Sequence, residues 1–234
     1  MNELKSYTLE THQGPHLNLN EDLVDVDLGL QLFMVIDGFG GSNIGDRTAM
    51  ASKDYIKRFF GKISRDPDST LPFFYSPKYL LETNALINAF RGAHEQVMKE
   101  NQSRSMNNRG GASVMALALS ETMASIVATG NCQAMLMRKE QLFTQMLPDS
   151  FANAPMSGIG LFEDFHYQAV EFKILPGDLL LLLTDGVYQR CELAEMQEIL
   201  KKYPANEKAF IQEIFQYAND RGNLDNQSVM ILQF

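Results

Sequence analysis

The stretch from Leu30 to Gly41, LQLFMVIDGFGG, constrains the fold of this 234-residue chain more than any other. Its apolar run is long enough for a buried strand, and the run ends in Asp37, which a glycine turn follows at once. The pattern predicts a carboxylate held at the edge of a rigid sheet. Because hard divalent cations prefer carboxylate oxygens as ligands, this edge is a candidate metal site.

Two further acids occur in similar contexts, since Asp185 ends the apolar run LLLLLTDG and Asp225 directly precedes the strand-like segment NQSVMILQF. With Glu21 and Asp22 in NLNEDLVDV, oxygen ligands would converge from four separated strand ends or turns. Such a set favours a phosphate hydrolase that uses two metal ions. A simpler interpretation stays open: an aspartate before glycine often bonds nearby backbone N–H groups in a turn, and Glu21 with Asp22 would be a solvated pair.

Composition limits the classes of function. With 45% hydrophobic residues the chain can bury a sizeable core, and we predict a single domain over residues 1–234. The 20 basic and 29 acidic residues give a formal charge of −9, which argues against a nucleic acid as partner. No segment approaches the roughly 20 apolar residues of a membrane helix, and no signal peptide is recognisable. Having only two cysteines, the protein is expected to be cytoplasmic, although secretion without a signal leaves no trace in a sequence.

The apolar periodicity predicts strands, two helices, strands, two helices and a last strand, in that order. Helices are expected over residues 43–64, 76–101, 193–203 and 207–221. Ser76, before Pro77, is expected to cap the second helix and Asn206 the fourth. Between the helix pairs, the runs SVMALAL, ASIVATG, QAMLMRK and QLFTQM predict an antiparallel meander, and 147–160 a surface loop. This α+β order predicts two packed antiparallel β-sheets, a β-sandwich, flanked by helix pairs.

Five motifs occur in an order that extends over nearly the whole chain. They are NED (20–22), DGFGG (37–41), RGGASVMALAL (109–119), PGDLLLLLTDG (176–186) and DNQSVMIL (225–232). Together they resemble the metal-dependent Ser/Thr protein phosphatases of the 2C type, the PPM family. The short segment 141–159 resembles compact bacterial members that dephosphorylate small regulatory proteins. The resemblance implies the same sandwich, with a metal cleft at one edge.

That resemblance also implies two Mn²⁺ or Mg²⁺ ions and assigns them a set of ligands. The residues concerned are Glu21, Asp22, Asp37, Gly38, Asp185 and Asp225. Asp37 would bridge the two ions, the Gly38 carbonyl would bind one of them, and Asp22 would hold metal-bound water. The four other acids, as direct ligands, would be the catalytic residues, and water activated there would attack phosphorus in line.

The chain departs from the family pattern at several positions. Leu17 replaces the usual phosphate-binding arginine, with His16 beside it as a candidate phosphate contact or a merely solvated side chain. Phe39 stands where the family has histidine or methionine. Asn131 and Gln189 replace acids that help to bind a third metal, so we predict two metals and a degraded third site.

Two hypotheses about function follow from the resemblance. The first is an active phosphatase that removes phosphate from serine or threonine of a protein substrate, opposed by a Ser/Thr kinase. The second is a catalytically weak or inactive relative that binds a phosphoprotein partner. We favour activity because the four carboxylate ligands are all retained, and carboxylates crowded together without metal would repel one another.

Overall fold

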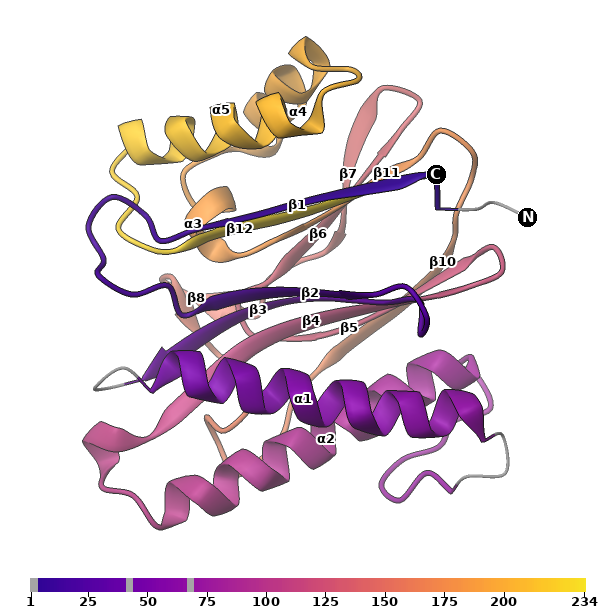
Figure 1. Ribbon diagram of the computed structural model, residues 1–234, viewed down its shortest axis with the longest axis vertical. Helices are drawn as coiled ribbons and strands as arrows, with labels where there is room; N and C mark the ends of the chain where they lie inside the picture. Colours follow the sequence, from indigo (N-terminus) through magenta and orange to yellow (C-terminus); the bar gives the residue numbers. More distant parts are fainter. Residues whose placement is uncertain (1–3, 41–43, 67–69) are drawn as a thin grey trace.

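The computed structural model describes residues 4–40, 44–66 and 70–234, and within them two five-stranded antiparallel sheets are stacked face to face (Figure 1). The first sheet contains, in spatial order, β1 (Ser6–His12), β12 (Gln227–Gln233), β11 (Leu179–Leu183), β6 (Gln133–Arg138) and β7 (Gln141–Met146). The second contains β10 (Gln168–Lys173), β5 (Met123–Thr129), β4 (Gly110–Ser120), β3 (Leu32–Gly40) and β2 (Asp22–Asp27). The predicted sandwich is confirmed.

Strand β3 shows why the stretch that begins at Leu30 is so continuously apolar. Phe33 and Val35 pack into the core between the two sheets, whereas Leu32, Met34 and Ile36 pack against the helices on the other face. A strand buried on both faces needs apolar residues at every position, and these five side chains are fully buried. The strand is therefore a rigid support for Asp37. It continues to Gly40 in register with β4, so the predicted glycine turn directly after Asp37 is wrong.

Helix pairs cover the outer faces of the sandwich, as predicted (Figure 1). Helices α1 (Gly45–Arg65) and α2 (Leu81–Gln102) pack on the second sheet, and α4 (Leu193–Lys202) and α5 (Glu207–Asp220) on the first. The remaining elements are α3 (Asp185–Tyr188), the 3-10 turn η1 (Met106–Asn108), β8 (Ser150–Phe151) and β9 (Ala154–Pro155). In the described part of the chain, no helix combines the length and apolarity that crossing a bilayer requires.

The second helix begins at Leu81, so the predicted start at Ser76 is wrong. Residues 76–80 form a turn in which the Asn84 side chain accepts from the Ser76 N–H (2.8 Å) and donates to the Ser76 carbonyl (3.0 Å). The Leu80 N–H at the helix start donates to the Glu171 carboxylate at 2.7 Å. Glu171 lies in β10, far from Leu80 in sequence, so local helix propensity could not reveal this contact. The expected cap at Asn206 is confirmed, because its side chain accepts from the Ala209 N–H.

The predicted meander is also wrong. Strands β4 and β5 pair in the second sheet, whereas β6 and β7 pair in the first, so the chain crosses between sheets at residues 130–132. Gly130 makes this turn at φ +83°, and a Cβ there would collide with the Ser113 side chain. The 147–160 segment contains the exposed β8–β9 hairpin, but its end is not surface loop, since Ser157 and Ile159 are buried and Ile159 pairs with Ala112.

Candidate metal centre

Acids from both sheets line one cavity of about 520 Å³. Asp37 comes from β3, Asp185 is the first residue of α3 just after β11, and Asp225 precedes β12. Glu21, just before β2, and Gly38 complete the predicted residues in the lining. The structure thus brings together residues that are up to 204 positions apart in sequence, from Glu21 to Asp225 (225 − 21).

Asp37 lies among the other acids. Burial raises the pKa of its carboxyl well above the usual range, and repulsion from Asp22, Asp185 and Asp225 raises it further. Among the described residues, no hydrogen-bond donor contacts the Asp37 carboxylate and no basic side chain pairs with it. Its negative charge therefore has no compensation from the described chain.

Asp22 pairs in register with Asp37 on the neighbouring strand. Its Oδ2 accepts hydrogen bonds from the hydroxyls of Thr184 (2.8 Å) and Ser228 (2.7 Å). Burial raises the pKa of Asp22 to about 7, and these two hydrogen bonds oppose the rise. Sequence reasoning missed both hydroxyls, because neither lies near Asp22 in sequence.

Asp185 accepts hydrogen bonds from two amides that replace acids of the family pattern. The Nδ2 of Asn131 (3.1 Å) and the Nε2 of Gln189 (2.8 Å) both donate to Oδ2 of Asp185. Burial and the charge of Asp225 raise the pKa of Asp185 to about 6, while the Asn131 hydrogen bond lowers it. The sequence predicts that amides at these two positions weaken a third metal site. In the structure, both amides contact Asp185, which is itself a predicted metal ligand.

Asn226 fixes Glu21 and the N-terminal loop against β12. Its Oδ1 accepts from the Glu21 N–H (2.8 Å), and its Nδ2 donates to the carbonyls of Gln13 (2.7 Å) and Leu19 (3.0 Å). The Glu21 carboxylate in turn accepts from the Gly45 N–H at 2.9 Å. Sequence reasoning passed over Asn226, although its place between a predicted ligand and a buried strand was a usable signal.

Glycine is required where β3 passes the start of α1. A Cβ on Gly38 would overlap the carbonyl oxygen of Gly45, and a Cβ on Gly45 would overlap Gly38 in return. The Gly38 N–H donates to the Glu21 carbonyl at 3.1 Å. This close approach holds the Gly38 backbone, a predicted metal ligand, beside the acids.

The candidate phosphate contact does not reach the cavity lining. His16 and Leu17 are exposed, and neither belongs to the residues that line the acid cavity. Arg47 lines a neighbouring cavity with Glu21 and Asp22, and Arg109 lines another with Phe39. No basic side chain occurs in the described lining of the acid cavity itself.

The donor set fits divalent cations such as Mn²⁺ or Mg²⁺ in its chemistry. It consists of carboxylate and carbonyl oxygens, and the carboxylates lack cationic partners among the described residues. In that part of the chain no group of three or more Asp, Glu, His or Cys side chains forms a ready metal cage. Hard ions that keep several water ligands need no such cage, so the acids could hold them around a wet cavity.

Comparison with solved structures gives the same fold over almost the full chain. PppA, a regulatory component of the type VI secretion system in Pseudomonas aeruginosa, is 22% identical, with a TM-score of 0.79 and 98% of both chains covered. The PPM Ser-Thr phosphatase MsPP from Mycobacterium smegmatis, solved with cacodylate, is 18% identical, with a TM-score of 0.78 and 99% of both chains covered. The catalytic domain of the phosphatase PstP, solved with two manganese ions, is 17% identical, with a TM-score of 0.79 and 97% of both chains covered.

The sequence itself matches a family model. No curated protein matches significantly. The model of stage II sporulation protein E (SpoIIE), which is PP2C-like, matches residues 84–232, well over half of the chain. This match includes the motifs around Asp185 and Asp225, and the solved PPM phosphatases share the fold of the whole chain. The chain therefore belongs to the PP2C-like phosphatases of the PPM family.

Proposed function

We propose that this protein is a metal-dependent phosphatase that hydrolyses phosphoserine or phosphothreonine in a protein substrate. The observation that supports this most is uncompensated charge at the acid cavity. Glu21, Asp37, Asp185 and Asp225 line one cavity, and none of them forms an ion pair with a described basic residue. Divalent ions would remove a repulsion that otherwise only destabilises the fold.

The proposed ion ligands are the six residues that the sequence pattern selects: Glu21, Asp22, Asp37, Gly38, Asp185 and Asp225. When bound, two Mn²⁺ or Mg²⁺ ions would supply positive charge for the phosphate oxygens and lower the pKa of the attacking water. The chain's own hydrogen bonds orient the acids: Thr184 and Ser228 hold Asp22, and two amides hold Asp185. With amides at the two positions of the third site, we propose a centre for two ions.

A weak or inactive phosphoprotein-binding module is the second candidate. It is favoured by the absence of a basic side chain from the described lining of the acid cavity. Without such a group, a phosphate would depend on the metal ions alone for charge. Either candidate implies a phosphorylated protein as partner and, for the enzyme, an opposing kinase. A cytoplasmic location is part of the proposal, and the free, buried thiols of Cys132 and Cys191 are consistent with a reducing compartment.

Hydrolysis of a phosphothreonine peptide tests the proposal, with Mn²⁺, Mg²⁺ or EDTA, in the wild type and in Asp37→Asn and Asp185→Asn. Asp220→Asn is the matched control, because Asp220 is exposed at the end of α5. We expect metal-dependent turnover that falls by at least about 100-fold in the two cavity variants, since even outer-shell changes at metal sites cost roughly 10- to 100-fold. The control should keep wild-type turnover.

Two results would contradict the proposed metal-dependent mechanism. One is full activity in EDTA, and the other is full activity of Asp37→Asn with Mn²⁺. If folded, metal-loaded protein turns over neither phosphopeptides nor phosphoproteins but binds them, the binding module becomes the better description.

A further inference from the structure

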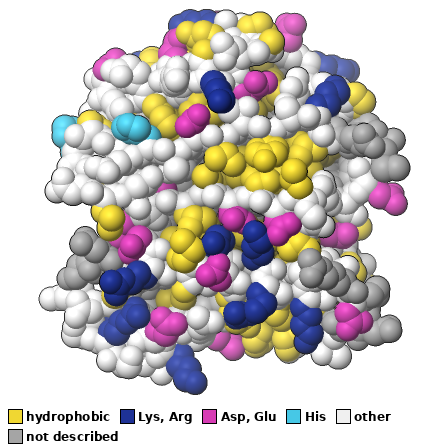
Figure 2. Space-filling view, viewed as in Figure 1, with side chains coloured by type: hydrophobic (Ala, Val, Ile, Leu, Met, Phe, Trp, Pro, Cys, Tyr) yellow, Lys and Arg dark blue, Asp and Glu magenta, His cyan; other side chains and the backbone are white. Residues whose placement is uncertain are grey.

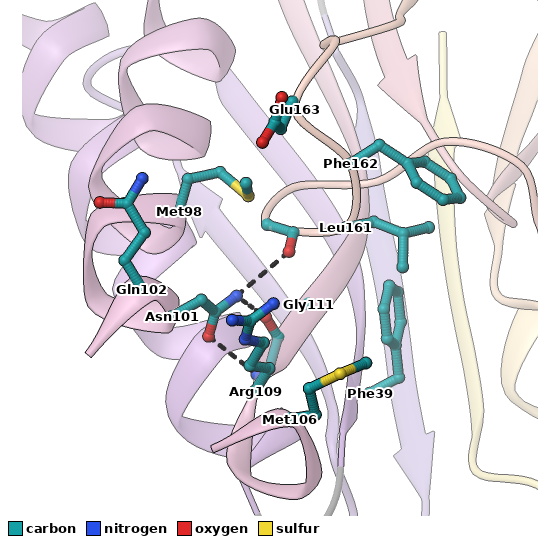
Figure 3. A pocket seen from close by; sticks show the side chains of 12 residues that line it. Phe39, Met98, Asn101, Gln102, Met106, Arg109, Gly111, Leu161, Phe162 and Glu163 are labelled. Carbon is teal, nitrogen blue, oxygen red and sulfur yellow. Dashed lines mark hydrogen bonds between the residues drawn. The ribbon is translucent and has the colours of Figure 1, made fainter. Parts of the chain in front are cut away.

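A second cavity, of about 530 Å³, lies beside the acid cavity and shares two walls with it (Figure 3). Phe39 and Leu161 line both cavities. Phe39 follows Asp37 by two positions on β3, so the two side chains project from the same face of the strand. We call this second cavity the Phe39 pocket. A ligand that reaches Asp37 can therefore extend into it across the Phe39 ring.

The walls of the Phe39 pocket are largely apolar and come from separate elements. Met98 belongs to α2, Met106 to η1, and Phe162 to the segment before β10. The three side chains line the same opening in Figure 3. Met106 is 80% exposed and Phe162 48% exposed, so large apolar groups meet water here. Methionine adapts its shape to different apolar partners, which suits a pocket for varied side chains.

Hydrogen bonds hold the floor of the pocket in place. The Nδ2 of Asn101 donates to the carbonyls of Gly110 (2.7 Å) and Gly160 (3.1 Å), and its Oδ1 accepts from the Gly110 N–H (3.1 Å). His94 Nδ1 accepts from the Gly160 N–H at 3.2 Å. Because the floor is ordered before any ligand arrives, binding there loses less conformational entropy.

Glycines leave the space that the Phe39 ring occupies. A Cβ on Gly111 would overlap the ring, and a Cβ on Gly158 would lie 3.2 Å from it. The ring therefore packs over these glycines, between the two cavities. Phe39, which stands where the family pattern has histidine or methionine, thus forms part of the wall of both cavities.

The pocket lining contains one side chain of each charge, Arg109 and Glu163, and both are exposed. Arg109 is exposed, lines the pocket and forms no ion pair with the described residues. An available guanidinium attracts the anionic phosphate of a phosphopeptide, whereas the Glu163 carboxylate repels it. The acid cavity itself repels such a ligand until cations are present, so the Phe39 pocket contributes apolar contact rather than net charge.

We propose that the Phe39 pocket binds an apolar side chain of the phosphoprotein substrate, close in sequence to the phosphorylated residue. This inference rests on the proposed function, because the phosphate is taken to occupy the acid cavity. The pocket then selects substrates by the residue that flanks the phosphorylation site. Phe39, Met106 and Phe162 are specificity-determining residues under this proposal.

Binding of non-hydrolysable phosphonate peptides tests this selection, measured by fluorescence anisotropy with Mn²⁺. One Leu is moved through each position on both sides of the phosphothreonine mimic, in a background of Gly and Ser. We expect Leu to tighten binding about tenfold at one or two adjacent positions on one side, as burial of part of a leucine allows. Met106→Ser and Phe162→Ser should each reduce this preference, and the double variant should abolish it.

Phe143→Ser is the matched control, because Phe143 is 44% exposed on β7 and does not line the pocket. It should keep the full preference for Leu. The proposal is overturned if no position favours Leu, if the preference survives in the double variant, or if no peptide binds at millimolar concentration. Thermal unfolding of each variant checks that the fold is retained.

Hydrolysis of p-nitrophenyl phosphate separates this inference from the proposed function, since that substrate has no flanking residue. Turnover without any preference for Leu would reject the proposed role of the pocket and support the phosphatase activity. A preference for Leu without turnover would reject the phosphatase activity and support the pocket as part of a phosphoprotein-binding site.

Discussion

Removing the charge of Asp22 should stabilise the metal-free protein at and above neutral pH. Burial raises the pKa of Asp22 from 3.8 to about 7. Between these two values the folded protein keeps a proton that the unfolded chain has released. The free energy of unfolding therefore falls as pH rises from about 4 to about 7, and above that range the ionised carboxylate costs roughly 4 kcal/mol.

The Asp22→Asn variant keeps an oxygen acceptor for Thr184 and Ser228 but has no charge to desolvate. In EDTA we expect equal stability of wild type and variant near pH 4, and a variant more stable by up to roughly 4 kcal/mol at pH 8. Asp185, with a pKa of about 6, lowers the free energy of unfolding further as pH rises. This contribution is present in both the wild type and the variant. Urea unfolding followed by circular dichroism at several pH values measures the difference.

Metal addition supplies the second half of this test. At pH 8, Mn²⁺ should raise the midpoint of unfolding more in the wild type than in Asp22→Asn, because the ions compensate the charge that the variant lacks. A constant difference between the two proteins from pH 4 to pH 8 would refute the electrostatic account. So would a wild-type stability that rises steadily over this range in EDTA.

Three further substitutions test the supports of the two cavities and of the first sheet. Gly38→Ala should destabilise the protein by at least about 2 kcal/mol in urea unfolding and weaken stabilisation by Mn²⁺, because its Cβ overlaps the Gly45 carbonyl. Asp178→Ala should cost about 3 kcal/mol by the same measurement, since the buried carboxylate accepts from Arg138 at 2.6 and 2.9 Å. Asn101→Ala should cost about 2–4 kcal/mol and abolish the Leu preference in the anisotropy assay, because Gly110 and Gly160 lose their partner.

The layers of the fold follow from local patterns. The apolar run before Asp37 predicted the buried strand β3, and the apolar periodicity predicted the four long helices α1, α2, α4 and α5. Assignment of strands to sheets did not follow, because β5 and β6 are neighbours in sequence yet belong to different sheets. Pairing depends on which distant strand offers a free edge, and no short segment contains that information.

For the candidate site, the sequence predicted acids at strand ends but not the groups that hold them. Asp37, Asp185 and Asp225 stood out because each interrupts or adjoins an apolar run. The hydroxyl partners of Asp22 are 162 and 206 positions away from it, so only the folded chain brings them together. His16 shows the opposite failure: it was selected for its nearness to Leu17 in sequence, and the fold leaves it outside the cavity lining.

Asn131 and Gln189, the two amides beside Asp185, have a structural role as well as being departures from the family pattern. Asn131 and Gln189 occupy positions where acids would help to bind a third ion, and both donate to one oxygen of Asp185. An acid at either position would add a negative charge next to a carboxylate whose pKa is already raised by Asp225. The Asn131 hydrogen bond therefore lowers the cost of keeping Asp185 ionised, and both amides contact the same oxygen, Oδ2. The same two residues would then both weaken a third site and support the proposed two-ion centre.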